Sequence, residues 1–322
     1  MTRAFEDKPA ARTDGVPLLV GLMGPSGGGK TYSALRLATG IQRVTGGDIH
    51  VIDTEARRAL HYSDRFRFRH VEFTPPFASL DYLAAIEHCA GRGANVIIVD
   101  SLSHEHEGPG GLLEQHDAEC QRLMGLWKAS RDKVQMAAWA GPKSARRRMI
   151  NTILQVQCHF IFCFRAKEKL KITRGKEPEK MGFMPIAGEE FVYEMAVNAL
   201  LLPNADGVPT WQSAEIGERQ MIKRPEQFRD LLPQGGKQLD EATGEAMARW
   251  AAGTVNSALS ELLAAIDSAG TEAELDALSE RAKRSVEAKK LSRADARQLS
   301  EKFKERRARS VAPTREPGSD DE

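Results

Sequence analysis

The chain has 322 residues, enough for a catalytic domain with a smaller domain attached, and it carries 46 Lys and Arg against 45 Asp and Glu. This balance argues neither for nor against a nucleic-acid partner, so only local clusters of charge bear on that question. The four cysteines form no CxxC pair, and no apolar run approaches the roughly 20 residues that span a bilayer. We therefore expect no membrane association and a cytoplasmic protein.

The first 15 residues are polar and lack the apolar segment of a secretion signal, so we expect a flexible leader. Residues 16–23 then form a short apolar run that ends at a glycine-rich turn. Residues 31–44 follow with the apolar spacing of a helix. This order predicts a strand, a loop and a helix.

The turn matches the phosphate-binding pattern G-x-x-x-x-G-K-[ST] with Gly24, Pro25, Ser26, Gly27, Gly28, Gly29, Lys30 and Thr31. In such a loop the backbone N–H groups converge on phosphate oxygens, and the following helix adds positive potential. Lys30 supplies a mobile charge, and Thr31 a hydroxyl for Mg²⁺. Together with the adjacent Tyr32, these residues predict a site for ATP and Mg²⁺.

Further buried strands are indicated by compact apolar runs at residues 49–52, 96–99 and 160–164. The segments between them are long enough for crossover helices, which we expect at residues 80–90 and 112–133. Alternating buried strands and helices predict an α/β fold with a mainly parallel sheet.

Asp100 follows the run at 96–99 and is the acid expected beside a phosphate loop. We predict that it orients a water on Mg²⁺ and, with Thr31, forms the metal site. The alternative is a strand-end aspartate that caps the next turn.

Hydrolysis also requires a carboxylate that positions water against the γ-phosphate. In the AAA+ class a glutamate directly follows the Walker B aspartate, but Ser101 occupies that position here. Glu55 instead follows the strand at 49–52, after Asp53 and Thr54. We predict Glu55 as the catalytic carboxylate, with Glu105 or Glu107 as alternatives.

These motifs, in this order, resemble the RecA recombinase family over about residues 16–232. The resemblance implies a RecA-like P-loop core, ATP hydrolysis, and an oligomer that holds nucleotide between subunits. In that family a glutamine follows the strand that corresponds to residues 160–164 here, and it senses the γ-phosphate. This chain has Arg165 at that position, and we predict that Arg165 contacts phosphate. A compact core with a helical extension is most similar to phage ATPases of recombination and single-strand annealing.

The segment 165–180 is strongly basic, with seven basic residues against three glutamates. It occupies the place of a DNA-binding loop in RecA-like proteins, so we predict contacts to single-stranded DNA from Lys167, Lys169, Lys171, Arg174 and Lys176. Phe183 and Met184 are expected to contact bases. A charged, solvated excursion is the alternative.

Two further clusters of basic residues are candidates for binding sites. Lys143 and Arg146 to Arg148 predict phosphate binding or a contact between subunits, with a plain exposed face as the alternative. Lys223 and Arg224 follow an expected strand at 220–223 and are candidates to reach the ATP of a neighbouring subunit. The alternative for this pair is a set of charges at the sheet rim.

Residues 104–111 are expected to form a loop that contacts DNA or a neighbouring subunit. His104 and His106 in this segment lack the spacing of a transition-metal site. Strands are expected at 196–202, 210–214 and 220–223, and a Pro/Gly break then places the end of the core near residue 235.

Residues 240–310 carry the spacing of about three helices, with starts expected near Thr271 and Ser292, and form a separate helical module. Residues 311–322 are polar and acidic, and we expect disorder there.

The leading interpretation is an ATP-hydrolysing recombination or annealing protein that acts on single-stranded DNA as an oligomer. Its helical module would contact a replication or recombination protein. The alternatives are an AAA+-type helicase loader or motor, and a nucleotide-binding regulator that does not bind DNA.

Overall fold

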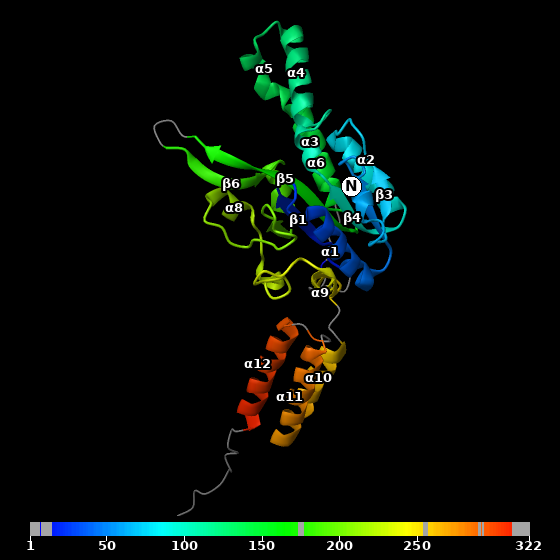
Figure 1. Cartoon of the computed structure of the whole chain (residues 1–322), viewed down its shortest axis with the longest axis vertical. Coiled ribbons are helices and arrows are strands. Elements are labelled where there is room, and N and C mark those ends of the chain that lie inside the picture. Colours follow the sequence, from blue (N-terminus) through cyan, green and yellow to red (C-terminus); the bar gives the residue numbers. More distant parts are fainter. Residues whose placement is uncertain are drawn as a thin grey trace, which may run out of the picture. The chain divides into compact units, whose positions relative to one another are not determined.

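The computed structural model describes Asp7, residues 15–172, 177–253 and 257–288, Leu291 and residues 293–310. The chain divides into two compact units (Figure 1). One unit is Gly15–Ala251, and the other contains the last three helices. Most of the expected leader and the whole of the expected acidic tail lie outside the described residues.

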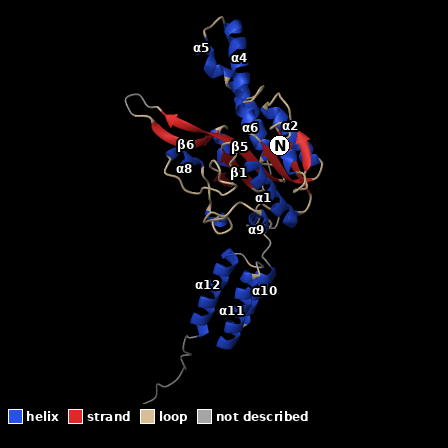
Figure 2. Cartoon of the chain, viewed as in Figure 1, coloured by secondary structure: helices blue, strands red, loops and turns tan. Residues whose placement is uncertain are grey.

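A seven-stranded sheet forms the centre of the first unit (Figure 2). The strand order is β3-β2-β4-β5-β1-β7, every pair along this path is parallel, and β6 pairs antiparallel with β5. The mainly parallel α/β fold is therefore confirmed. The strands are β1 (Leu19–Gly24), β2 (Asp48–Asp53), β3 (Arg69–Glu72), β4 (Ala94–Asp100), β5 (His159–Lys171), β6 (Glu179–Pro185) and β7 (Val197–Leu200).

Helices connect and cover these strands. Those of the first unit are α1 (Lys30–Thr45), α2 (Ser79–Gly91), α3 (Ser103–Glu107), α4 (Leu112–Trp127), α5 (Arg131–Ala138), α6 (Ala140–Ile153), α7 (Glu189–Glu194), α8 (Ile216–Met221) and α9 (Glu241–Ala251), with short 3₁₀ segments η1 (Arg58–Tyr62) and η2 (Glu226–Phe228). Those of the second unit are α10 (Ser257–Ser268), α11 (Glu272–Glu287) and α12 (Arg293–Ser310).

Both faces of the sheet are buried, which explains why its central strands are almost entirely apolar. Along β4, Ile97 and Val99 belong to a cluster that includes side chains of α2 and α6. Val96 and Ile98 belong to the opposite cluster, which includes side chains of α1 and α9. Successive residues of a strand point to opposite faces, so one apolar run supplies both cores.

The segment expected as one helix at 112–133 is two helices. Lys128 has φ of 48°, a left-handed conformation that ends α4, and Ser130 is the residue before α5. The two helices pack through Cys120, Leu123 and Val134 and form an arm that projects from the sheet (Figure 1).

The basic segment is a hairpin rather than a loop. Strand β5 continues past the buried run to Lys171 and pairs with β6, with Lys167 opposite Met184 and Lys169 opposite Gly182. The hairpin extends away from the rest of the sheet (Figure 1). Arg174 and Lys176, two of the predicted DNA contacts, lie outside the described residues.

Two of the later strand predictions are wrong. Residues 210–214 contribute only a single bridge, between Thr210 and Leu200. Residues 220 and 221 lie in α8, and Lys223 forms one bridge to Asn198. Short runs with few apolar residues do not distinguish a strand from a helical turn, and here tertiary packing decides.

The core extends further along the chain than residue 235, because α9 packs on α1. A Cβ on Gly40 of α1 would come within 2.0 Å of the backbone oxygen of Glu241, so the two helices touch through glycine. Ion pairs at 2.7 Å (Arg36 with Glu241) and 2.9 Å (Arg43 with Glu245) flank this contact. The helical module thus begins after Ala251.

The second unit has its own core, which includes Leu262, Ile266 and Leu275. Thr271 accepts a hydrogen bond from the backbone N–H of Glu274 and forms a capping box at the start of α11, where the sequence predicts a helix start. Ser292, the other predicted start, lies outside the described residues. In the described part of the chain, no helix is both long and apolar enough for a membrane span.

Candidate nucleotide-hydrolysis site

The phosphate loop lies between β1 and α1, where the sequence predicts it. Gly27 and Gly29 have φ of 82° and 88°, a region that side-chain-bearing residues rarely adopt. A Cβ on Gly24 would come within 2.1 Å of the backbone oxygen of Leu201. The glycines are therefore required by the shape of the loop and by its close contact with the segment after β7.

Lys30 extends along this loop. Its ammonium group donates hydrogen bonds to the backbone oxygens of Gly24, at 2.9 Å, and Pro25, at 2.8 Å. Burial lowers the pKa of Lys30, and the nearby charges of Asp100 and Glu55 oppose that shift. The ammonium is held where the loop would present it to a bound phosphate.

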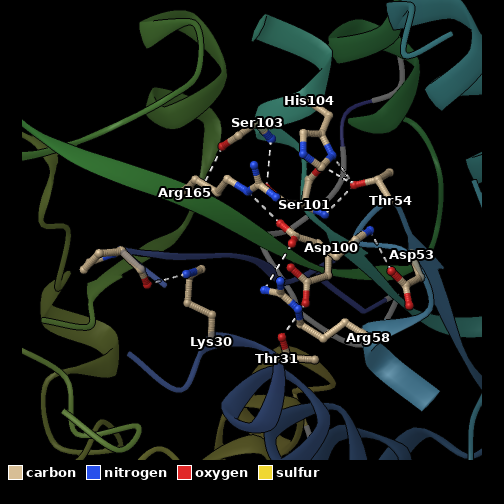
Figure 3. A network of polar contacts seen from close by, with 12 residues as sticks. Lys30, Thr31, Asp53, Thr54, Arg58, Asp100, Ser101, Ser103, His104 and Arg165 are labelled. Carbon is tan, nitrogen blue, oxygen red and sulfur yellow. Dashed lines mark hydrogen bonds and ion pairs between the residues drawn. The ribbon is translucent and has the colours of Figure 1, made fainter. Parts of the chain in front are cut away.

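Thr31 and Asp100 meet at the carboxyl edge of the sheet. The Thr31 hydroxyl donates to the Asp100 carboxylate with an Oγ1–Oδ2 distance of 2.5 Å (Figure 3). Burial raises the pKa of Asp100, while the hydrogen bond from Thr31 and the charge of Lys30 oppose this. A hydroxyl and a carboxylate beside a phosphate loop are oxygen ligands of the kind Mg²⁺ prefers, so the residues fit this cation.

Glu55 follows β2, and its side chain is only 6% exposed. Its carboxylate accepts a hydrogen bond from Nε of Arg165 at 2.7 Å and forms an ion pair with Arg58 at 3.1 Å. Burial works to raise the pKa of Glu55, but the hydrogen bond and charge of Arg165, with the charge of Arg58, bring it below the usual value. Glu55 is therefore ionised at neutral pH.

The turn that carries Glu55 is fixed by polar contacts that the sequence analysis did not identify. Asp53 accepts hydrogen bonds from the backbone N–H groups of Glu55, at 2.8 Å, and Ala59, at 2.9 Å. The Thr54 hydroxyl donates to the Ser101 backbone oxygen at 3.0 Å and accepts from the Ser101 N–H at 2.8 Å. The turns after β2 and β4 are thus joined (Figure 3).

Helix α3 takes up residues 104–107 of the loop expected at 104–111, and residues 108–111 form the turn before α4. His104 lies near Thr54, with 2.7 Å between Nδ1 and Oγ1. Ser103 Oγ accepts a hydrogen bond from the backbone N–H of Arg165 at 2.9 Å (Figure 3). Small polar residues at the ends of adjacent buried strands are the sequence signal that could have revealed these contacts.

Arg146 fits neither the phosphate or subunit contact predicted for the cluster of Lys143 and Arg146 to Arg148 nor the alternative of an exposed face. Its side chain is 4% exposed and pairs with the buried Glu105 at 2.6 Å. Ser79 donates a further hydrogen bond to Glu105 at 2.5 Å. A buried guanidinium paired in this way is unavailable to phosphate or to another subunit, so Arg146 holds α6 to α3 instead. Glu105 is likewise excluded as the alternative hydrolytic carboxylate.

A pocket of about 860 Å³ brings Lys30, Thr31, Glu55, Asp100 and Arg165 together. Its size suits a nucleotide. The lining also includes Glu107, the other alternative carboxylate, and residues that the sequence did not indicate for this site: Arg58, Tyr62, Arg65, Asp206 and Gln238.

Lys223 and Arg224 do not line this pocket. Lys223 donates to the backbone oxygens of Tyr193 and Met195, at 3.1 and 2.6 Å, and Arg224 donates to that of Arg229 at 2.6 Å. Their action on the ATP of a neighbouring subunit stays a prediction.

The base contacts predicted for Phe183 and Met184 do not fit the structure. Met184 is buried at 8% exposure, and Phe183 packs against the same core cluster. They anchor the base of the hairpin.

Comparison with protein families gives a match to an AAA domain over residues 17–200. The matched segment contains the phosphate loop, Asp100, Glu55, Arg165 and the β5–β6 hairpin. A comparison with curated proteins gave no match. With more than half of its residues matched, around a phosphate loop and a magnesium-type acid in their expected places, the chain belongs to the AAA domain family of P-loop ATPases.

Proposed function

We propose that this chain hydrolyses ATP and acts on single-stranded DNA in recombination or annealing, as an oligomer. The observation that carries the proposal is the course of β5. This strand passes the ATP pocket at Arg165 and continues into the basic hairpin. One rigid element therefore joins the hydrolytic site to the proposed DNA contact.

The pocket supplies the groups that phosphoryl transfer to water requires. Lys30 binds the phosphates, and Thr31 and Asp100 hold Mg²⁺, which neutralises phosphate charge when bound. The ionised Glu55 accepts a proton from the attacking water or orients it. Arg58 and Arg165 bring positive charge to the same place and stabilise charge that develops on the γ-phosphate.

Arg165 gives this pocket a means of responding to nucleotide. Its guanidinium pairs with Glu55, and it is 42% exposed toward the pocket that it lines. A γ-phosphate in the pocket would compete with the carboxylate for the same guanidinium. Movement of Arg165 toward phosphate would release Glu55 to act on water and would shift β5, so the arginine serves as the phosphate sensor.

The hairpin has the chemistry of a single-strand contact. Lys167, Lys169 and Lys171 alternate along β5 and are exposed, so all three point to one face of the ribbon. Leu170, on the other face, is 59% exposed, and Ile172, directly after β5, is 80% exposed. Lysines neutralise phosphates, and exposed apolar side chains can contact unstacked bases.

Lys167 also forms an ion pair with Glu107, which lines the pocket, at 3.2 Å. DNA phosphates would compete with Glu107 for Lys167. Binding of DNA would therefore alter charge at the edge of the ATP site, and ATP binding would alter the hairpin in return.

The family match favours one alternative, an AAA-type loader or motor. Such an enzyme would form a ring, whereas a recombination ATPase would form a filament on DNA. Imaging the chain with ATP and single-stranded DNA distinguishes these assemblies. Lys223 and Arg224 are proposed to face the neighbouring nucleotide in either case.

The DNA contact is tested by replacing Lys167, Lys169 and Lys171 together with glutamine. Each lost phosphate contact lowers the slope of log affinity against log salt by roughly 0.7, so the triple variant should lose about 2 units of slope on single strands. Fluorescence anisotropy with a labelled oligonucleotide measures this over a salt series. Affinity for ATP should change little.

A matched control replaces Lys128, Lys133 and Lys283, three exposed lysines outside the hairpin, with glutamine. The control removes the same net charge and should keep the wild-type slope. Equal slopes in wild type, hairpin variant and control would exclude the hairpin as the DNA contact. A wild-type chain that binds no DNA at any salt concentration would favour a nucleotide-binding regulator instead.

A further inference from the structure

The Glu55–Arg165 pair joins the ends of two strands that are not neighbours, because β4 lies between β2 and β5. Asp100 of β4 is level with Asp53 on one side and with Cys163 on the other. Glu55 and Arg165 each follow two residues later, so the chain that continues from β4 is placed to contact both ends of the pair. That chain leads directly into α3.

His104 of α3 contacts the residue before Glu55. Its Nδ1 lies 2.7 Å from the Thr54 hydroxyl oxygen (Figure 3). The Thr54 hydroxyl gives its one proton to the backbone oxygen of Ser101 and accepts a hydrogen bond from the Ser101 N–H. A hydroxyl has two acceptor positions, so the second is taken by Nδ1–H of His104. With this bond, every hydrogen-bonding position of the Thr54 hydroxyl is filled.

The His104 ring is held in the orientation that this bond needs. It stacks on Phe77 with 4.9 Å between ring centroids and 22° between ring planes. Phe77 is buried, and its backbone N–H donates to the backbone oxygen of Pro109 at 2.8 Å. The imidazole therefore lies between a fixed aromatic ring and Thr54, which keeps Nδ1 directed at the hydroxyl.

The preceding residue of α3 holds the other end of the pair. Ser103 is buried, and its hydroxyl oxygen accepts a hydrogen bond from the backbone N–H of Arg165 at 2.9 Å (Figure 3). Two consecutive residues of α3 thus bind the segments that carry Glu55 and Arg165. The side chain of His104 does not line the ATP pocket, so any effect of His104 on hydrolysis passes through Thr54.

We propose that His104 is a positioning residue for hydrolysis: its Nδ1–H bond to Thr54 fixes the turn that carries Glu55 and so sets the place of the Glu55 carboxylate in the pocket. This inference rests on the proposed ATP hydrolysis. The bond involves neither the phosphate loop nor Lys30, so its loss should slow the hydrolytic step and leave ATP binding nearly unchanged.

The test separates the place of the hydrogen-bonding group from its polarity. In His104→Asn the side-chain amide takes the place of Nδ1, because both are attached to Cγ, whereas in His104→Gln the amide lies one atom further along, nearer the place of Nε2. His88→Gln is the control, since His88 is exposed on α2. Turnover assays on the full chain give kcat and KM, and calorimetry with Mg²⁺ and a non-hydrolysable ATP analogue gives the affinity.

His104→Gln should lower kcat at least about tenfold, because a shift of about 1 Å in a group that acts on the substrate can cost about a hundredfold. Its affinity for the analogue should stay close to that of wild type, which also shows that the variant is folded. His104→Asn should recover most of the wild-type kcat. The control should match wild type in kcat, KM and affinity.

A double variant shows whether His104 acts through Thr54. Thr54→Val keeps the branched shape but removes the hydroxyl, and it should lower kcat because the contacts with Ser101 are lost as well. Adding His104→Gln to Thr54→Val should then lower kcat no further, since the partner of Nδ1 is already gone.

Equal kcat in wild type and both His104 variants would overturn the inference, as would equally large losses in His104→Asn and His104→Gln. Losses that multiply in the double variant would overturn it too, because His104 would then act by another route. A wild-type chain that does not hydrolyse ATP at all would instead contradict the proposed function, and this inference with it.

Discussion

At the scale of single residues, Glu55 has two opposing influences on its carboxylate. Burial favours the protonated acid, and the guanidinium of Arg165 favours the carboxylate. The arginine prevails, so the pKa of Glu55 lies below its usual value. The site therefore keeps an ionised carboxylate in a buried place, which a glutamate without its arginines would not provide.

The same balance predicts a pH dependence. In wild type, the limb of the kcat/KM profile that reports ionisation of Glu55 should lie on the acid side of an ordinary glutamate pKa. Arg165→Gln removes the stabilising charge and leaves the burial, so the pKa of Glu55 rises and the acid limb moves to higher pH. ATPase rates over a pH series measure this. Arg57→Gln, at an exposed arginine paired with Glu72, is the control and should leave the limb in place.

Glu55→Gln should bind Mg-ATP with little change yet hydrolyse it at least about a hundredfold more slowly, because a general base contributes about that much. Turnover assays measure the rate of hydrolysis and calorimetry measures the affinity for Mg-ATP, so together they separate the two effects. Glu107→Gln, also at the pocket, is the comparison and should retain most of the activity. A larger loss in the Glu107 variant would assign the base to α3 instead.

At the scale of elements, the contact between α1 and α9 depends on the absence of side chains. Gly40→Ala places a methyl group against the backbone of Glu241, and we expect a loss of about 1–3 kcal/mol in the free energy of unfolding. Gly125→Ala, in the last turn of α4, is the control, since a Cβ there meets nothing within 4 Å. That change should stabilise the chain by about 0.5–1 kcal/mol. Chemical denaturation measures both, and equal effects would contradict the close packing.

The elements differ in how far the sequence predicts them. The phosphate loop, α1 and the strand before Asp100 follow from local requirements, because a phosphate cradle needs glycines and a buried strand needs apolar residues. Strand β3 and the β5–β6 hairpin were not foreseen, because Arg69–Glu72 and the lysine-rich run are polar and their pairing is set by neighbours distant in sequence. Burial of Arg146 was missed for the same reason, since its partner Glu105 lies 41 residues away.

At the scale of the whole molecule, the boundary between units predicts where the chain can be shortened. A chain that ends at Gly253 keeps α9 and should fold and bind ATP. A chain that ends at Leu239 loses α9 and exposes the buried face of α1, including Leu37 and Ile41, so it should be insoluble or melt at lower temperature. Thermal melting with and without Mg-ATP compares them. Equal stability would show that α9 is not part of the core.

The central claim is that ATP hydrolysis and single-stranded DNA binding are joined through β5. The most direct test is the steady-state ATPase rate of the full chain with and without single-stranded DNA at fixed salt. We predict a severalfold rise in turnover on adding DNA, lost in the triple lysine variant of the hairpin, with no turnover in Lys30→Ala under either condition. A rate that is the same with and without DNA in the active wild-type protein would contradict the account.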